Sequence, residues 1–378
     1  MDPVDLWSVI KENRTQNRRM VELAKELFYF TNTDFLQEAL HLFDLNLGEQ
    51  KIASDEEKQR YLIGSIMEES IASSQIEGAV TSRVAAKEML RKDRAPRNKS
   101  ERMIVNNYQT IQHIIAIKKE PLTPEALLNI HQLMVDQTMD NPDEAGQFRQ
   151  HDDIHVVDAI ESEVIHTPPS FSTLPDFIQD LCEFFNDETP GFFLHPVVKA
   201  SIIHFLIGYF HPFTDGNGRT ARALFYWYLL RKGYWLTEYL SISRVIKESR
   251  NQYYRAFQYT EADENDLTYF VVYQVKTLSK AYDELKKYIA HKNQEKQQQL
   301  ALQRNEGLSP RQAEIVDWLQ RDPNVTLSAK EVQIRLGVSN QTARFDIQAL
   351  IEAGYLADFL INRKERRYVR GPRFDKQT

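Results

Sequence analysis

The stretch HPFTDGNGRTAR, residues 211–222, places a histidine, a carboxylate, glycines and arginines within one short run of chain. Gly216 and Gly218 would let the backbone approach a ligand closely, and successive N–H groups at a helix N-terminus favour an anion. Arg219 and Arg222, on the helix that would follow, add bidentate donors. The stretch therefore predicts a binding site for a polyphosphate.

The remaining polar residues of the stretch have roles that fit such an anion. Asp215 lies among positive groups, as expected if a divalent cation links it to phosphates, because magnesium is usually held by one or two carboxylates plus substrate. His211 could accept a proton from an attacking hydroxyl as a general base. Together these residues indicate a magnesium nucleotide and a transferase reaction.

Ordinary structural explanations exist for each part of the stretch. A histidine before Pro-Phe commonly ends a helix, Asp-Gly-Asn-Gly is a common turn sequence, and Phe213 is expected to anchor the core. The run GNGRTA matches a dinucleotide-binding pattern, with Glu238 about 20 residues further on, but that pattern requires a preceding strand. Here a helix that ends before Pro212 precedes it. The coincidence of all these groups favours the functional interpretation.

The elements that position the stretch are predicted to be helices, because apolar residues recur at helical spacing over most of the chain. Helices are expected over Glu56–Glu77 with Gly78 as C-cap, over Leu174–Phe185, from His195-Pro196 to before Pro212, and from Arg219 to Gly233. The chemical stretch is then a loop between two buried helices. Residues 152–167, DDIHVVDAIESEVIHT, alternate around a polar centre before two prolines, which predicts a two-stranded flap.

Composition limits the classes of function. The chain has 378 residues and a net charge of -7, so the whole protein has no general attraction to nucleic acid or to anionic membranes. Cys182 is the only cysteine, which excludes an intramolecular disulfide and fits a reducing compartment. No signal peptide is recognisable and the most apolar window, 192–213, carries charged and histidine side chains, so we expect a cytoplasmic protein without a membrane span.

The C-terminal part differs from the rest. After a glutamine- and lysine-rich segment typical of a solvated helical linker, residues 308–378 give three helical patterns and then the alternating DFLINRKERRYVR. This order predicts a winged helix-turn-helix. Its basic residues would suit phosphate contacts on DNA: Arg344, Arg363, Lys364, Arg366 and Arg367. Residues 301–378 hold 13 basic and 10 acidic groups, a net of +3, so a protein partner or a dimer contact remains an alternative to DNA.

HPFTDGNGRTAR resembles the signature of Fic proteins, His-x-Phe-x-Asp/Glu-Gly-Asn-Gly-Arg-x-x-Arg, at every defined position. The resemblance covers most of residues 60–280, through LTPEALLNIHQLM, GQFR, HPVVKASIIHFLIGYF and ESRNQYYRAF. It implies a mainly α fold: an N-terminal helical region over 1–115, an all-helical Fic domain with a β-hairpin flap over 116–285, a linker over 286–306 and a winged helix over 307–378.

The resemblance also implies an activity: transfer of AMP from ATP to a Ser, Thr or Tyr hydroxyl of a target protein, and of the protein itself, with Mg²⁺ required. On that basis His211 would be the catalytic base, Asp215 would hold the metal and Phe213 would fix the loop. The flap would hold the target's backbone by strand addition. The residues expected to contact the nucleotide are Glu77, His211, Gly216, Asn217, Gly218, Arg219, Thr220, Ala221, Arg222 and Tyr253.

More specific roles follow from the same resemblance. Asn217 would orient the α-phosphate and Arg222 would reach the γ-phosphate. Tyr253 and Tyr254 match positions near the adenine, where stacking would be natural. Of the two, we expect Tyr254 to pack in the core instead.

The end of the first predicted helix indicates a brake. Glu77 places a negative charge at a helix C-terminus, where the dipole disfavours it by about 0.3 kcal/mol or more, and Ser73 shares its face. Residues 73–78, SSQIEG, resemble the inhibitory motif Ser/Thr-x-x-x-Glu-Gly/Asn of one class of Fic proteins, in which the glutamate pairs with the second signature arginine. This implies that Glu77 pairs with Arg222 and keeps resting activity low. A solvated helix end is the alternative.

A second function stays open at this stage. The Fic domain could sense nucleotide while the winged helix binds DNA, as in a transcriptional regulator. A homodimer is compatible with these parts, but no residue indicates one.

Overall fold

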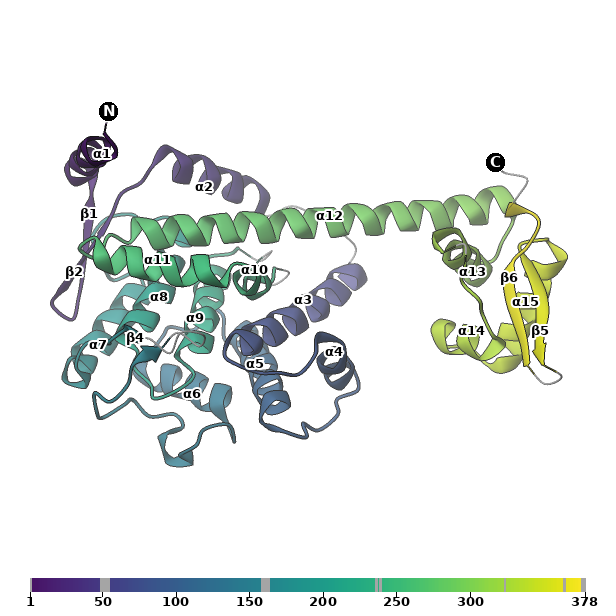
Figure 1. The fold of residues 1–378 in the computed structure, drawn as a ribbon, viewed down its shortest axis with the longest axis horizontal. Coiled ribbons are helices and arrows are strands. Elements are labelled where there is room, and N and C mark those ends of the chain that lie inside the picture. The colour runs from purple at the N-terminus through teal and green to yellow at the C-terminus, as the bar shows by residue number, and fades with distance from the viewer. Residues whose placement is uncertain are drawn as a thin grey trace. The chain divides into compact units, whose positions relative to one another are not determined.

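The computed structural model describes residues 2–47, 55–157, 164–234, 237, 240–322, 324–362 and 365–374. The chain forms two compact units, Met1–Leu285 and Lys286–Thr378. As predicted, the described part is mainly helical with small antiparallel hairpins (Figure 1). No helix among these described residues is long and apolar enough to span a membrane.

The first unit contains most of the helices. Its elements are α1 (Pro3–Asn17), β1 (Arg19–Leu23), β2 (Glu26–Phe30), α2 (Asp34–Leu47), α3 (Asp55–Ile76), α4 (Arg83–Arg91), α5 (Lys99–Ala116), α6 (Pro124–Val135), β3 (Val156–Val157), β4 (Val164–His166), α7 (Leu174–Phe185), α8 (Pro196–Phe210), α9 (Asn217–Arg231), α10 (Ile242–Glu248) and α11 (Arg250–Ala262). Then α12 (Thr268–Glu306) begins in this unit and continues into the second.

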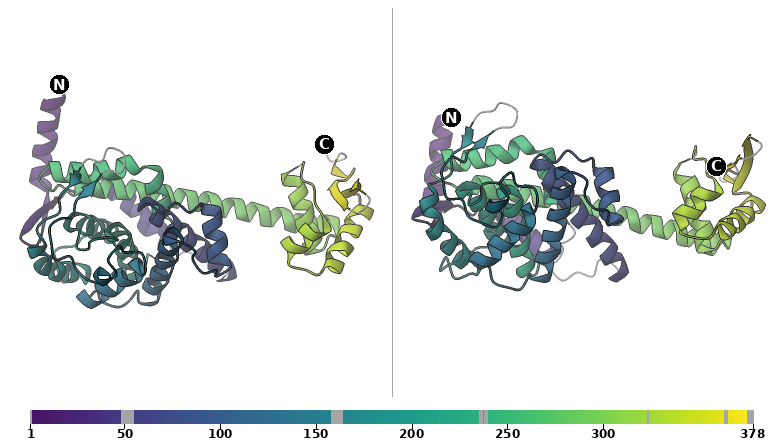
Figure 2. Two further views of the ribbon diagram at one scale, coloured as in Figure 1. Left: turned by 60° about the horizontal axis from the view of Figure 1, so that its bottom comes forward. Right: turned by 90° about the horizontal axis from the view of Figure 1, so that it is seen from below.

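The core of the first unit surrounds α8 and α9, which pack against each other. α8 is apolar on all sides, so nearly every one of its residues is buried, as expected for a central helix. Phe270, at the start of α12, packs on Phe205 of α8 and Phe257 of α11. Figure 2 shows from two further sides how the first half of α12 runs along this helical core.

The bounds of α8 follow from its sequence. Pro196 occupies the first helical position, and the Nδ1 atom of His195 accepts a hydrogen bond from the N–H of Val197 at 3.2 Å. The helix ends at Phe210, before Pro212, and His211 takes a left-handed conformation with φ of 49°. The predicted helices α7 and α8 are confirmed.

The β1–β2 hairpin is a feature that the sequence reading missed. Its strands pair antiparallel from Arg19 opposite Phe30 to Leu23 opposite Glu26. Ala24 and Lys25 make the turn with φ values of 51° and 65°, which glycine, asparagine or aspartate usually supplies. Without those residues, the turn has no sequence signal.

The second unit has the predicted order of a winged helix: α13 (Pro310–Arg321), α14 (Ala329–Leu336), α15 (Asn340–Glu352), β5 (Leu356–Asn362) and β6 (Glu365–Arg370). Capping boxes start two of the helices, at Ser309 in α13 and at Ser328 in α14. Aliphatic residues from all three helices and the hairpin form one core. Arg363 and Lys364, which were expected to contact DNA, lie outside the described residues.

Candidate active site

The loop from His211 to Gly216 joins α8 to α9, as the sequence predicts. Phe213 is fully buried, and its ring stacks on His131 with centroids 3.7 Å apart. The side chain of Asn217 holds the loop closed, because its Oδ1 accepts from the N–H of Phe213 at 3.0 Å and its Nδ2 donates to the carbonyl of Phe213 at 2.7 Å. Asn217 is buried and used in shaping the loop, and its predicted contact to an α-phosphate stays a prediction.

The N-terminus of α9 carries Gly216 and Gly218, whose backbone we call the glycine nest. Gly216 is the N-cap with φ of 80°, so α9 begins at Asn217, two residues earlier than predicted. A Cβ at Gly216 would lie 2.7 Å from Val135, and the positive φ favours glycine as well. Gly216, Asn217 and Gly218 line the cavity beside His211. The N–H of Gly216 donates to Oδ1 of Asp215 at 2.6 Å. The N–H groups of a first helical turn have no intrahelical acceptor, so an anion would be stabilised at this end of α9.

His211 is arranged to act as a base. Its Nδ1 donates to the carbonyl of Gly208 at 2.9 Å, which leaves Nε2 as the acceptor in the neutral ring. Burial lowers the pKa of His211 to about 4, against the opposing effect of the hydrogen bond to Gly208. The imidazole is therefore neutral near pH 7 and can take up a proton.

The two signature arginines are buried, each 1% exposed, and have unused donors. Arg219 donates from Nη1 to the carbonyl of Met134 at 3.1 Å, while its Nε and Nη2 have no hydrogen-bond partner. The Nη1 of Arg222 also lacks one. Buried charged donors without acceptors are costly, so these atoms are expected to meet acceptors from a ligand. Phosphate oxygens would supply them.

Asp215 lies beside Arg219 and is more exposed than the two arginines. Its side chain is 52% exposed, and its Oδ2 lies 3.6 Å from Nη2 of Arg219. Within the described ranges, no three His, Cys, Asp or Glu side chains form a cluster able to hold a metal on their own. A single carboxylate on the cavity wall fits magnesium that arrives with phosphates better than a resident metal.

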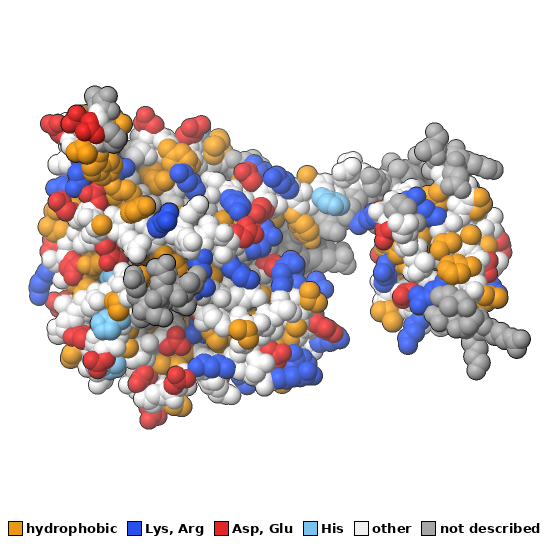
Figure 3. All heavy atoms as spheres, viewed as in Figure 1, with side chains coloured by type: hydrophobic (Ala, Val, Ile, Leu, Met, Phe, Trp, Pro, Cys, Tyr) orange, Lys and Arg blue, Asp and Glu red, His pale blue; other side chains and the backbone are white. Residues whose placement is uncertain are grey.

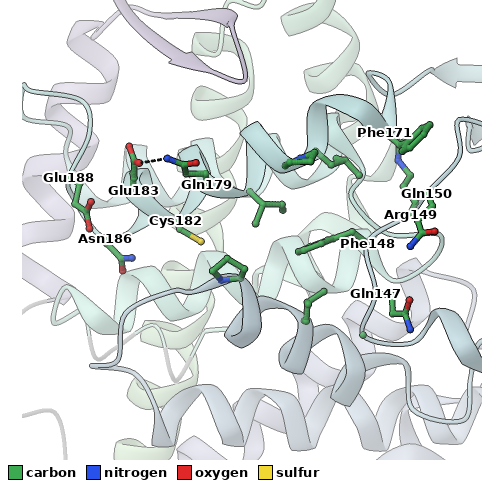
Figure 4. A pocket seen from close by; sticks show the side chains of 16 residues that line it. Gln147, Phe148, Arg149, Gln150, Phe171, Gln179, Cys182, Glu183, Asn186 and Glu188 are labelled. Carbon is green, nitrogen blue, oxygen red and sulfur yellow. Dashed lines mark hydrogen bonds between the residues drawn. The ribbon is translucent and has the colours of Figure 1, made fainter.

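The loop forms one wall of a cavity of about 430 Å³. The predicted site residues His211, Asp215, Gly216, Asn217, Gly218 and Ala221 line it, together with Glu77 and Tyr253. Thr220 is buried beneath, and its Oγ1 has no hydrogen-bond partner. A larger hollow, of about 820 Å³, lies between α6, α7 and residues 146–150 and contains none of the predicted site residues (Figure 4).

Burial of the two tyrosines of α11 differs from the expectation. Tyr253 is 6% exposed, and its hydroxyl lies 2.9 Å from Nε2 of His204 in the core. Tyr254 is half-buried, lines the cavity and accepts a hydrogen bond from Nε of Arg250 at 3.1 Å. Core packing therefore describes Tyr253 better than Tyr254, because α11 turns the first of them toward α8. Tyr254 and Arg250 are among the residues through which α11 lines the cavity.

The C-terminal end of α3 lines the same cavity as the first residues of α9. Nε of Arg222 donates to Oγ of Ser73 at 2.8 Å, and its Nη2 donates to the Ser73 carbonyl at 3.1 Å and to Oε1 of Glu77 at 2.8 Å. A Cβ placed on Gly218 would lie only 2.9 Å from Cδ of Glu77. The carboxylate thus rests against the glycine nest, and the predicted pairing of Glu77 with Arg222 is present.

The charge of Glu77 is stabilised in this position. Burial would raise the pKa of Glu77, but the adjacent Arg222 outweighs it and the pKa lies below its ordinary value. Gly78 follows with φ of 92° and ends the helix as the expected C-cap. Glu77 therefore lies just beyond α3 as an ionised group facing the arginines.

Glu69, which sequence reasoning did not single out, ties α3 to the rest of the unit. It is 3% exposed and accepts hydrogen bonds from the hydroxyl of Tyr226 at 2.9 Å, from Oγ of Ser241 at 3.1 Å and from the N–H of Ser243 at 3.0 Å. Arg250 adds a bond to the carbonyl of Ile76 at 3.0 Å. These long-range contacts fix the helix end that carries Glu77.

His131 is another site residue that the sequence did not reveal. It is fully buried; its Nδ1 accepts from the N–H of Gly146 at 3.1 Å and its Nε2 donates to the carbonyl of Asp215 at 2.9 Å. Burial lowers the pKa of His131 to about 4. The neutral ring holds the loop through its hydrogen bond to the carbonyl of Asp215 and its stacking on Phe213.

The predicted flap is present as two short strands. β3 pairs antiparallel with β4, with Val156 opposite His166. The centre of the flap, residues 158–163, lies outside the described part. The ring of His166 lies between Oε2 of Glu261, at 2.8 Å from Nδ1, and the carbonyl of Tyr209, at 2.7 Å from Nε2. These contacts join the flap to α11 and α8.

Comparison with known proteins identifies two domains. Residues 121–229 match the Fic/DOC family, and residues 311–357 match the DeoR-like helix-turn-helix domain. A protein adenylyltransferase Fic from Drosophila yakuba is 30% identical over 167 residues, 44% of this chain and 30% of that protein. One from Nematostella vectensis is 35% identical over 121 residues, 31% of this chain and 25% of that protein. The chain thus spans less than a third of these relatives' lengths.

Solved structures show the same fold. A Fic family protein from Desulfovibrio desulfuricans G20 superposes with a TM-score of 0.59 at 20% identity, over 90% of this chain and 97% of that one. A fragment of Fic-1 from C. elegans gives a TM-score of 0.53 at 19% identity, over 68% of this chain and 72% of the other. Residues 121–229 therefore form a Fic/DOC family domain and residues 311–357 a DeoR-like helix-turn-helix domain, and the chain is distantly similar to protein adenylyltransferases.

Proposed function

We propose that this protein is an adenylyltransferase that transfers AMP from magnesium-bound ATP to a Ser, Thr or Tyr hydroxyl of a target protein and of itself. The observation that carries the proposal is the composition of one cavity wall. A neutral histidine, a half-exposed carboxylate and the N-terminus of α9 meet there, above buried arginines with unsatisfied donors. Phosphoryl-type transfer requires mainly such positioning and charge neutralisation.

The reaction assigns a task to each group. The target's hydroxyl oxygen bonds to the α-phosphorus, the bond from that phosphorus to the oxygen bridging the β-phosphate breaks, and pyrophosphate leaves. Nε2 of His211 takes the hydroxyl proton. The N–H groups at Gly216–Arg219 and the guanidinium of Arg219 would offset the phosphate charge, and Asp215 would hold the magnesium that ATP brings.

The same proposal includes a brake. Arg222 uses Nε and Nη2 in three hydrogen bonds to Ser73 and Glu77, so only its Nη1 is left for a γ-phosphate while α3 stays in place. The Glu77 carboxylate against Gly218 would also repel phosphate. We expect ATP to bind in an unproductive position in the resting protein.

A labelling experiment tests the transferase. Purified Glu77→Gly and Glu77→Gly/His211→Ala proteins are incubated with magnesium and ATP labelled on its α-phosphate, alone and with a cell extract. We expect label on protein in the single variant and a loss of about 10²-fold or more in the double variant, since a base contributes on that order. Equal labelling by both would remove His211 from the mechanism.

The winged helix supports a second candidate function, a nucleotide-sensing regulator that binds DNA. α15 exposes Asn340, Gln341 and Arg344 near its N-terminus, the side-chain types that read base edges in the major groove. Phe345 is 71% exposed on the same helix, which suits a protein contact equally well. On the face visible in Figure 3, acidic and basic side chains are interspersed on the first unit. The net charge of -7 likewise gives the whole chain no general attraction to DNA.

The two candidates differ in one measurement. A pool of random DNA duplexes with a fluorescent label is titrated with wild-type and His211→Ala protein, with and without magnesium and ATP. The regulator predicts an affinity for DNA that changes with nucleotide equally in both proteins. An adenylyltransferase alone predicts no such change.

A further inference from the structure

Arg149, the last residue of the GQFR segment, is 4% exposed although it lies outside the predicted site. Arginine is seldom buried to this extent unless its donors are paired. It borders the flap at one end of the hollow between α6 and α7, beside Gln150 and Phe171 (Figure 4). Its partners therefore show what it holds together.

Every N–H of the Arg149 guanidinium has an acceptor. Nε donates to the carbonyl of His211 at 2.9 Å. Nη1 donates to the carbonyl of His151 at 2.9 Å and to Oδ1 of Asp152 at 2.8 Å. Nη2 donates to the carbonyls of Pro169 and Phe210. The planar fork of arginine can satisfy five acceptors in this way, and the ammonium of lysine cannot.

These acceptors come from three places that the proposed reaction needs in a fixed relation. His151 and Asp152 lie where the chain enters the flap, and Pro169 lies where it leaves. Phe210 and His211 end α8 and begin the signature loop. The backbone N–H of Arg149 also donates to the carbonyl of Pro212 at 2.9 Å. One buried side chain thus joins both ends of the flap to the backbone of the proposed base.

The backbone conformation of His211 shows why the hydrogen bond from Arg149 to its carbonyl matters. A histidine with φ of 49° is in the left-handed region, which costs a non-glycine residue about 1 kcal/mol. The hydrogen bond from Arg149 to the His211 carbonyl holds the peptide that follows this residue. The bond from Nδ1 to the Gly208 carbonyl, which leaves Nε2 free, depends on that backbone position.

We infer that Arg149 is a positioning residue for transfer: it sets the separation between the flap and His211, so that a hydroxyl on a strand paired with the flap lies within reach of Nε2. This inference rests on the proposed function for its catalytic part. It does not involve Arg149 in nucleotide binding, because every N–H of its guanidinium already has an acceptor within the protein.

The experiment compares variants in the Glu77→Gly protein. Self-labelling from α-labelled ATP gives kcat and the KM for ATP, and ¹⁵N shifts of labelled histidine rings, assigned with His211→Ala, give the tautomer of His211. Arg149→Lys is the main variant. Asp152→Asn, which removes the negative charge beside Nη1 of Arg149 but keeps an oxygen acceptor, is the milder one. Arg94→Lys is the control, since Arg94 also pairs with a carboxylate, that of Glu101, far from the flap.

We expect Arg149→Lys to lower kcat about 10²-fold, the order expected for a misplacement of about 1 Å, with little change in the KM for ATP. The His211 signals should change from the Nδ1–H tautomer to an average of both. Asp152→Asn should give a smaller loss of kcat, and Arg94→Lys none.

Parent kcat in Arg149→Lys would overturn the inference, as would equal losses of kcat and ATP affinity, which mark general damage to the fold. If the Glu77→Gly protein itself transfers no label, the proposed transferase fails separately. The ring shifts then still decide: an unchanged His211 tautomer in Arg149→Lys would refute the positioning role, and an averaged one would support it.

Discussion

Arg219 and Arg222 lie one turn apart on α9 and are equally buried, yet they have different partners. Arg219 keeps two nitrogen atoms without hydrogen bonds, whereas Arg222 donates to Ser73 and Glu77 at the end of α3. Arg219 thus has two donors for the phosphate that the proposed function requires, whereas Arg222 keeps only Nη1 and already binds the carboxylate of Glu77. In the proposed phosphate site, one arginine thus has donors for a ligand while the other is held by Ser73 and Glu77 of the same chain.

The largest expected effect concerns the arginine with unused donors. Arg219→Lys in the Glu77→Gly protein should lower kcat/KM for ATP by about 10²-fold, because losing one preorganised donor to a developing charge typically costs that much. Initial rates of label transfer over a range of ATP concentrations measure it. A thermal melt controls for folding, since Arg219 also donates to Met134. An unchanged kcat/KM would show that its unused donors do not face phosphate.

A smaller effect is expected where the other arginine meets Ser73. Ser73→Ala in the otherwise unchanged protein removes the acceptor of Nε of Arg222 and should raise the basal labelling rate about fivefold, as expected for one hydrogen bond of about 1 kcal/mol. Ser70→Ala is the matched control, because the hydroxyl of Ser70 bonds within α3 to the carbonyl of Ile66. Equal rates for the two variants would mean that Ser73 does not hold Arg222 in check.

The smallest expected effect is that of pH on the brake. Because the pKa of Glu77 is lowered, its ion pair with Arg222 persists above the ordinary carboxyl pKa and is lost only as pH falls through the still lower folded-state value. The ratio of Glu77→Gly to wild-type rates should therefore stay constant from about pH 5.5 to 8.5. Taking the ratio cancels effects of pH on the chemistry itself. A ratio that approaches one at the acid end would contradict the ion pair as the brake.

Local features of the site could be predicted from the sequence, and distant contacts could not. The bounds of α8 follow from prolines at 196 and 212. Glycines at 216 and 218 mark the end of the loop and the start of α9. By contrast, Arg149 and His131 support the loop through partners more than 60 residues away. No pattern in a single sequence predicts hydrogen bonds between residues so far apart in the chain.

Two further differences have the same physical origin. The turn of the β1–β2 hairpin uses Ala24 and Lys25, whose left-handed conformations are imposed by the surrounding structure rather than by residue type. Tyr253 and Tyr254 are adjacent residues of the same type on α11, so residue type cannot distinguish them. Only packing decides which of the two rings faces the core. Burial of Tyr253 beside His204 settles that choice.

The most direct test of the account compares wild type with the Glu77→Gly protein, both purified and incubated with magnesium and α-labelled ATP, with nucleotide affinity measured alongside. Release of Arg222 should raise the initial rate of AMP incorporation at least tenfold, which corresponds to about 1.4 kcal/mol of stabilisation at the transition state. ATP affinity should change much less. Equal rates in the two proteins, with ATP bound by both, would contradict the claim that the chain blocks its own phosphate site.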